Sequence, residues 1–252
     1  MNHSLVDRRQ MFQRSALLAG AAALPSVVAA NLHQEEPISL KKGDVILFQG
    51  DSITDAHRNK KKQGDANSPE ALGNGYPLYA ASGILGSRPS LDLKVFNRGI
   101  SGHKVPDLQK RWKKDTIDLQ PAILSILIGV NDIWHKLNGK YDGTVKSYQS
   151  GFAELLKQTK EELPDTKIVI CEPFVTRCGA VKNNWFPEFD QRRAAAKEVA
   201  KDTGAIWVPF QQIFNDAIAA GTSPQHWAHD GVHPTYSGHS LMAQTWRDTV
   251  GI

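Results

Sequence analysis

The sequence predicts an α/β protein, a three-layer α/β/α sandwich in which five parallel strands form a sheet between two layers of helices. Short apolar, β-rich segments alternate with helical patterns, and strands that alternate with helices pair in parallel through right-handed crossovers. Residues 122–128 are apolar almost throughout, which is typical of a central strand buried on both faces. About 220 residues follow a leader-like N-terminus, a length that suits one such domain.

The individual elements follow from the same patterns. Strands are expected over residues 45–48, 93–96, 122–128, 167–171 and 205–208. Apolar side chains that recur at helical spacing from Tyr148 to Thr159 predict a helix with one buried face, which Pro164 ends. Further helices are expected over residues 187–203, 209–220 and 236–250. In such a sheet, functional groups gather beyond the carboxyl ends of the strands.

The N-terminus has the order of an export signal. Arg8 and Arg9 precede an Ala-rich apolar run that ends in small residues near Ala30, which predicts a signal over residues 1–30, of the twin-arginine type. Residues 31–42 are then a polar lead-in, and residues 43–252 form the folded domain. We expect the protein to be exported, either periplasmic or secreted. An uncleaved membrane anchor is the alternative, although the apolar run of about 16 residues is shorter than the roughly 20 that span a bilayer.

Charge and cysteine content further limit the kinds of partner and structural site that we expect. The formal net charge is +4, and half of it lies in residues 1–30, so no nucleic-acid partner is expected. A short basic run at residues 58–62 is typical of a solvated loop. Two cysteines, Cys171 and Cys178, are too few for a disulfide framework or a zinc site. We expect Cys171 to be a core residue, and a bond between the two after export remains an alternative.

Three predicted loops carry residues suited to chemistry. Ser52 lies in GDSIT after the first strand, where a helix N-terminus favours developing negative charge. Gly99 lies in NRGISG, where a glycine lets the backbone approach a ligand. Asn131 lies in GVND after the central strand and could aim its amide across the sheet edge. Each has a structural alternative, because serine and asparagine also cap helices and glycine also forms ordinary turns.

A fourth loop, before the last expected helix, contains Asp230 and His233. Their three-residue spacing lets the carboxylate accept a hydrogen bond from one imidazole nitrogen while the other nitrogen faces away. The alternative is a pair of zinc ligands. A third ligand would then come from a nearby histidine: His226, His229 or His239.

Taken together, the four segments resemble the four-block signature of the SGNH (GDSL-type) hydrolases. The resemblance spans residues 50–234 and implies the flavodoxin-like fold of that superfamily. It also implies a serine esterase with Ser52 as nucleophile and with Asp230 and His233 as the other triad members. The oxyanion hole would comprise the N–H of Ser52, Gly99 and Asn131. No metal and no organic cofactor is implied.

A finer resemblance concerns residues 73–76, 97–102, 111–112 and 129–134, which are similar to bacterial acetyl-xylooligosaccharide esterases. It implies O-deacetylation of acetylated oligo- or polysaccharides, although residues 226–229 depart from the pattern of that subfamily. Aromatic rings stack on sugars, and Trp134 and Trp227 lie nearest in sequence to Asn131 and Asp230, so we expect them to bind substrate. Trp112 and Trp185 are further candidates, and each of these four tryptophans has core packing as its alternative.

The sequence is also compatible with two other functions. One is a lysophospholipase or short-chain lipid-type esterase of the same superfamily, which would need a wide apolar groove. The other is a glycan-binding protein that has kept the fold without catalysis. The expected partner is a small-molecule or oligosaccharide ester, with no stable membrane association once the signal is removed. A homo-oligomer remains open.

Overall fold

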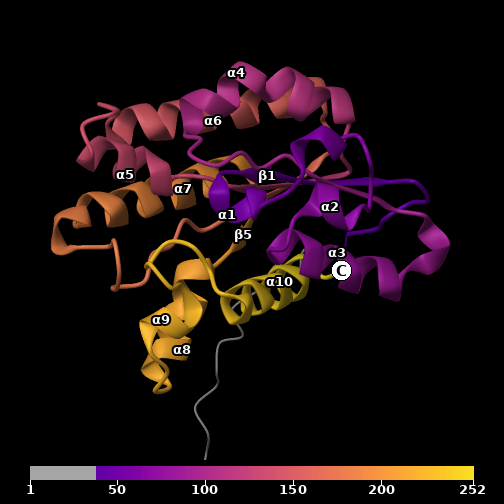
Figure 1. Cartoon of the computed structure of the whole chain (residues 1–252). Coiled ribbons are helices and arrows are strands. Elements are labelled where there is room, and N and C mark those ends of the chain that lie inside the picture. The colour runs from indigo at the N-terminus through magenta and orange to yellow at the C-terminus, as the bar shows by residue number, and fades with distance from the viewer. Residues whose placement is uncertain (1–37) are drawn as a thin grey trace, which may run out of the picture. The chain divides into compact units, whose positions relative to one another are not determined.

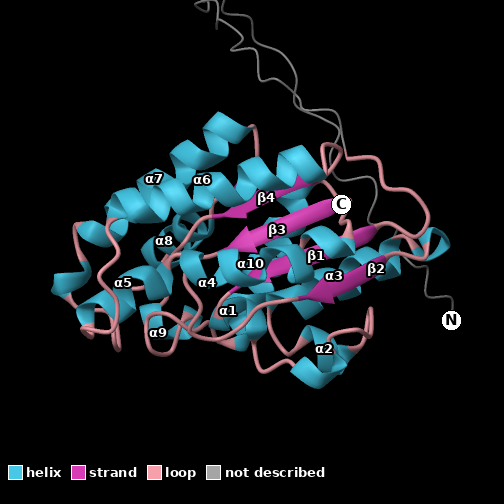
Figure 2. Ribbon diagram, turned by 90° about the horizontal axis from the view of Figure 1, so that it is seen from above, coloured by secondary structure: helices cyan, strands magenta, loops and turns pink. Residues whose placement is uncertain are grey.

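A computed structural model describes residues 38–252 and contains one five-stranded sheet in which all neighbouring strands are parallel, in the order β2-β1-β3-β4-β5. The sheet lies between two layers of helices (Figure 1). In the view of Figure 2 the arrowheads of the strands point toward the end of the molecule where α1, α5 and α9 lie. The strands are β1 (Val45–Gly50), β2 (Lys94–Asn97), β3 (Ile123–Leu127), β4 (Lys167–Cys171) and β5 (Ile206–Val208).

Helices connect these strands in sequence order. The α-helices are α1 (Ser52–Asp55), α2 (Pro69–Leu72), α3 (Tyr76–Ser87), α4 (Val105–Asp115), α5 (Val130–Leu137), α6 (Val145–Glu162), α7 (Glu188–Thr203), α8 (Phe210–Ala219), α9 (Pro224–Trp227) and α10 (Tyr236–Val250). Short 3₁₀ turns are η1 (Lys60–Lys62), η2 (Pro89–Leu91), η3 (Ile117–Leu119) and η4 (Asn183–Trp185). No helix in the described part is long and apolar enough to span a bilayer.

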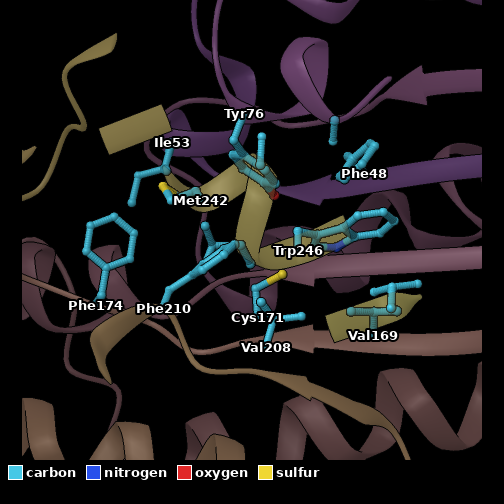
Figure 3. Packing of buried hydrophobic residues seen from close by; sticks show 14 of the residues in the cluster. Phe48, Ile53, Tyr76, Val169, Cys171, Phe174, Val208, Phe210, Met242 and Trp246 are labelled. Carbon is cyan, nitrogen blue, oxygen red and sulfur yellow. The ribbon is translucent and has the colours of Figure 1, made fainter. Parts of the chain in front are cut away.

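Side chains alternate between the two faces of the sheet, as the pleat requires. On β1, Ile46 and Phe48 belong to the core under α3, α8 and α10, whereas Leu47 belongs to the core under α4, α6 and α7. Figure 3 shows the first of these cores, where Phe48 and Trp246 pack with ring centroids 5.0 Å apart. The indole N–H of Trp246 donates to Ser125 Oγ on β3 at 2.9 Å. Both faces of the central strands are therefore buried, which explains their continuous apolar sequence.

The chain reverses its direction of winding between β1 and β3, which are neighbours in the sheet although β2 lies between them in the sequence. At such a switch point the loops after the two strands diverge to opposite faces and leave a crevice. The loop after β1 carries Ser52, and the loop after β3 carries Asn131. The topology alone therefore brings these two residues to the same edge of the sheet.

The structure confirms the predicted fold class, the five strands to within a few residues, and the helices α6, α7, α8 and α10. Cys171 and Cys178 are free, buried thiols, so the alternative of a bond between them is not met. The predicted export signal and most of the lead-in segment lie outside the described residues.

Candidate active site

Ser52 is the first residue of α1, directly after β1. The side chain of Asp51 caps this helix by accepting from Ile53 N at 3.0 Å. The tight strand-to-helix turn leaves the Ser52 side chain partly exposed in an otherwise buried segment. As the first N–H of a helix, that of Ser52 has no intrahelical acceptor and is available to a ligand. Asp51, and not Ser52, therefore caps this helix with its side chain.

Ser52, His233 and Asp230 form a hydrogen-bonded chain. Ser52 Oγ lies 2.9 Å from His233 Nε2, and His233 Nδ1 lies 2.7 Å from Asp230 Oδ2. The ionised carboxylate can only accept, so the proton between these two groups belongs to Nδ1 of the imidazole. Nε2 is then an acceptor that faces the serine hydroxyl. The structure thus brings together the three residues that the sequence placed in two loops 181 positions apart.

The other carboxylate oxygen of Asp230 is held by the backbone. Asp230 Oδ1 accepts from Val232 N at 2.9 Å and from His233 N at 2.7 Å. Burial alone would raise the pKa of Asp230, but its hydrogen bonds to the His233 ring and to these two N–H groups outweigh burial and lower the pKa. Asp230 therefore stays ionised and fixed in orientation, as a partner of a general base must be.

The structure corrects the expected role of Gly99. Its N–H donates to the Asn97 side chain at 2.8 Å, so it is not free to bind a developing oxyanion. A Cβ at this position would overlap the backbone of Thr54 and Asp55. Gly99 is therefore needed for the close packing of its loop on α1, and not as a hydrogen-bond donor.

Gly102, three residues further along the same loop, fits the donor role better. It adopts a φ of +81°, and a Cβ there would meet only a His135 ring atom at 3.8 Å, so its surroundings are open. Its N–H has no hydrogen-bond partner among residues 38–252. The carbonyl of the next residue, His103, accepts from Asn131 Nδ2 at 3.2 Å, which places Gly102 beside the Asn131 amide. Asn131 keeps its second amide hydrogen for another acceptor.

Arg111 on α4 braces these loops from behind. Its guanidinium donates to the carbonyl oxygens of Gly50 at 3.2 Å and Arg98 at 2.8 Å, and to His103 Nδ1 at 3.1 Å. It also pairs with Asp115 at 3.1 Å. One side chain therefore contacts the end of β1, the loop after β2 and His103, the residue that accepts from the Asn131 amide.

Asp55 connects the same loops from the other side. Its Oδ2 accepts from Ser101 N at 3.0 Å and Ser101 Oγ at 2.8 Å, and it lies 2.9 Å from Lys60 Nζ. Burial would raise the pKa of Asp55, but these donors outweigh burial and lower it. The carboxylate is thus ionised and holds the loop after β2 against α1.

Two further carboxyl groups, Asp51 and Asp132, flank the serine and the asparagine and are buried. Burial raises the pKa of each to about 7. Each has one oxygen bonded to a backbone N–H, at 3.0 Å for Asp51 and 3.4 Å for Asp132. The second oxygen of each has no partner among the described residues. Neither residue was predicted from the sequence to have a role, because a sequence motif does not show whether a carboxyl group is buried.

A cleft of about 650 Å³ opens beside Ser52 and His233. Its walls include His57, Asn74 and Tyr236. Its volume lies within the usual range of ligand sites, about 300–1,000 Å³. The cleft is large enough for more than an acyl group and gives a substrate direct access to the Ser52 hydroxyl.

The two tryptophans predicted to bind substrate, Trp134 and Trp227, are partly exposed but are not among the residues that line this cleft. Trp227 donates its indole N–H to Thr222 Oγ1 at 2.6 Å and packs on Phe214, and it does not line the cleft. Trp134 packs against Trp185 and against the ring of the catalytic His233, with centroids 5.6 Å and 6.0 Å away, so it lies beside the triad and its predicted contact with substrate stays a prediction. Trp112 and Trp185 are core residues, 1% and 2% exposed. Tyr236, which the sequence analysis did not single out, is the aromatic side chain in the cleft wall.

The zinc alternative would need a histidine near Asp230 and His233 as a third ligand. His239 Nδ1 accepts from Tyr76 N at 3.1 Å, and burial lowers the pKa of His239 to about 4, so this ring is a neutral structural acceptor. The ligand atoms of His229, Asp230 and His233 lie within 4.8 Å of one another. However, the two imidazole rings are stacked at 6.2 Å with planes 23° apart. Lone pairs in nearly parallel, stacked rings do not converge on one ion, so the geometry favours the hydrogen-bonded triad.

Comparison with known protein families agrees with this geometry. Residues 48–241 match the model of the GDSL-like lipase/acylhydrolase family. The chain belongs to this family. It is 31% identical over 218 residues to an acetylxylan esterase from Geobacillus stearothermophilus, which covers 85% of this chain and 97% of that protein. The chain is therefore a carboxylic ester hydrolase of the GDSL-like family.

Solved structures of GDSL-like proteins share the fold. A GDSL-like lipase from Parabacteroides merdae superposes with a TM-score of 0.82 at 46% identity, covering 86% of this chain and 99% of that one. The Geobacillus acetylxylan esterase superposes with a TM-score of 0.74 at 32% identity, covering 84% and 96%. Variants of that esterase described as catalytic mutants replace a serine, an aspartate or a histidine by alanine. The aspartate and the histidine are three positions apart there, as Asp230 and His233 are here.

Proposed function

We propose that this GDSL-like hydrolase removes acetyl groups from acetylated oligo- or polysaccharides through an acyl-enzyme on Ser52. The observation that carries the proposal is the 2.9 Å contact between Ser52 Oγ and His233 Nε2, together with the 2.7 Å contact between His233 Nδ1 and Asp230 Oδ2. The saccharide part is supported by the relatedness to acetylxylan esterase and by the polar side chains in the cleft wall, which include His57, Lys60 and Asn74.

In the first half-reaction, Ser52 Oγ attacks the ester carbonyl carbon while His233 Nε2 takes the hydroxyl proton. The carbonyl oxygen becomes an oxyanion, which accepts hydrogen bonds from the N–H of Ser52, the N–H of Gly102 and the Asn131 side chain. Asp230 stabilises the imidazolium. The tetrahedral centre collapses, the C–O bond to the sugar breaks, and His233 protonates the departing sugar oxygen.

In the second half-reaction, water takes the place of the alcohol. His233 removes a proton from the water as it attacks the acyl carbon, and then returns that proton to Ser52 Oγ as acetic acid leaves, which ionises to acetate in solvent. The bonds and protons balance without a metal ion or an organic cofactor. Asp230 keeps its negative charge throughout, because its hydrogen bonds hold its pKa below the ordinary value.

Two assays test this function. A fluorophosphonate probe should label the wild-type protein and leave Ser52→Ala unlabelled, since the probe reacts with an activated serine. Acetate release from acetylated xylo-oligosaccharides should exceed hydrolysis of the matched butyrate and octanoate esters. Labelling of Ser52→Ala would remove Ser52 from the mechanism, and a preference for octanoate would replace the saccharide assignment by a lipid-type esterase.

A further inference from the structure

Tyr236 is an exposed aromatic residue at the rim of the active-site cleft. Its relative exposure is 71%, whereas the other large apolar side chain that is exposed among residues 38–252, Leu137, is only 37% exposed. A single exposed aromatic ring needs no explanation by itself. Tyr236, however, lines the same cleft as Ser52 and His233, three positions after the catalytic histidine.

The backbone that carries the ring is fixed before any ligand binds. Tyr236 is the first residue of α10, and the helix is capped by Thr235, whose Oγ1 accepts from Gly238 N at 3.2 Å. Thr235 also donates from its hydroxyl to the His226 carbonyl at 2.6 Å and from its N–H to the Trp227 carbonyl at 2.9 Å. A ligand that contacts Tyr236 therefore does not have to order the backbone there, which limits the entropy cost of binding to the side chain.

The other walls of the cleft carry several polar side chains beside the apolar Ile53, Ala56 and Pro234. These polar side chains include His57, Asn74 and Lys60, which are all exposed. The backbone of this wall is also fixed, because Asn74 N donates to the Ala56 carbonyl at 2.9 Å and Tyr76 N donates to His239 on α10. The cleft thus combines one aromatic surface with a set of hydrogen-bonding groups.

We propose that Tyr236 is the platform on which a sugar ring of the substrate's alcohol part stacks. A pyranose ring has C–H groups on its faces and hydroxyl groups around its edge, so it needs an aromatic surface beneath and polar partners at the sides. His57, Asn74 and Lys60 supply such partners. An alkyl chain would leave these polar groups without a hydrogen-bond partner. This inference rests on the proposed function and names the residue that selects a saccharide.

The test compares Tyr236→Ala, Tyr236→Phe and wild type on two acetate esters, acetylated xylotriose and ethyl acetate, which has no ring to stack. Tyr236→Ala should raise KM for the acetylated xylotriose about 3- to 10-fold, the size expected for one lost aromatic contact. Its effect on ethyl acetate should be much smaller. Tyr236→Phe, which keeps the ring, should restore most of the affinity. Leu137→Ala is the matched control for removal of an exposed apolar side chain outside the cleft, and should change neither substrate.

Binding without turnover gives a second measurement. In a Ser52→Ala background, calorimetric titration with acetylated xylotriose should show a Kd that rises by the same factor on adding Tyr236→Ala. An unchanged Kd and KM for Tyr236→Ala, or equal effects on both esters, would overturn the platform while leaving the esterase intact. A wild-type enzyme that hydrolyses ethyl acetate and not the acetylated saccharide would overturn the saccharide part of the proposed function, and the platform with it.

Discussion

Replacing Asp230 by asparagine tests whether the hydrogen-bond geometry of the triad sets the imidazole tautomer. Asp230 Oδ1 accepts from two backbone N–H groups, at 2.9 Å and 2.7 Å, and Oδ2 accepts from His233 Nδ1. In Asp230→Asn the amide oxygen must take the place of Oδ1, because an NH₂ group cannot face two donors. The NH₂ group then points at His233 Nδ1 and donates to it.

The consequence is that the His233 imidazole adopts the other neutral tautomer. Nδ1 becomes an acceptor, so the proton moves to Nε2, which faces Ser52 at 2.9 Å. His233 can then no longer take the serine proton. We expect kcat on ethyl acetate to fall by about 10⁴, which corresponds to about 5.5 kcal/mol. The free energy of unfolding should change little, since the amide retains both backbone hydrogen bonds.

The assay pairs steady-state kinetics with ¹⁵N NMR of the His233 ring. Wild type should show the proton on Nδ1, and Asp230→Asn should show it on Nε2. Asp230→Ala is the control, because it removes all three acceptor contacts and should lose more stability than the asparagine variant. A kcat within tenfold of wild type, or an unchanged tautomer in the asparagine variant, would refute the reasoning.

Two further predictions concern the oxyanion hole and the buried carboxyl beside it. Asn131→Ala should lower kcat about 10²- to 10³-fold with little change in KM; near-wild-type turnover would take the Asn131 side chain out of the hole. Burial raises the pKa of Asp132 to about 7 from 3.8 in an unfolded chain, so the folded state binds the extra proton and stability falls as pH rises between about 4 and 7. Asp132→Asn keeps an acceptor for Val105 N and carries no charge. Its stability relative to wild type in urea denaturation should therefore improve by about 2–4 kcal/mol from pH 4 to pH 8, and an equal difference at both pH values would contradict this.

The strands were predictable because burial on both faces leaves an unbroken apolar signal in β3. Helix α6 was predictable because one side only is buried, which produces the Tyr148–Thr159 periodicity. Helix α3 has no such stripe, since apolar and small residues surround it, and its sequence (YPLYAASGILGS) shows no clear face. Helix α4 did carry a signal that the sequence analysis left unused: Val105, Leu108 and Trp112 are its buried apolar residues, at helical spacing.

The triad followed from the sequence because each member is a distinctive residue type in a loop that the topology brings to the sheet edge. The glycine whose N–H faces the oxyanion could not be identified from the sequence. Gly99 and Gly102 are equivalent in sequence, and only the side chain of Asn97, which accepts the Gly99 N–H, distinguishes them. The aromatic residue in the cleft wall, Tyr236, was missed for a related reason. Closeness in sequence to Asn131 or Asp230 says nothing about the direction in which an indole points.

The Arg111 contacts have a consequence for the spacing of the backbone next to Ser52. The carbonyl of Gly50 ends β1 and that of Arg98 begins the loop after β2, yet both accept from the same guanidinium. That group is planar and rigid, so the spacing between the two segments is set by covalent geometry. The segments cannot part without breaking a charged, mostly buried contact. The loop after β2 therefore keeps a constant distance from the end of β1, next to Ser52, with no help from a bound ligand.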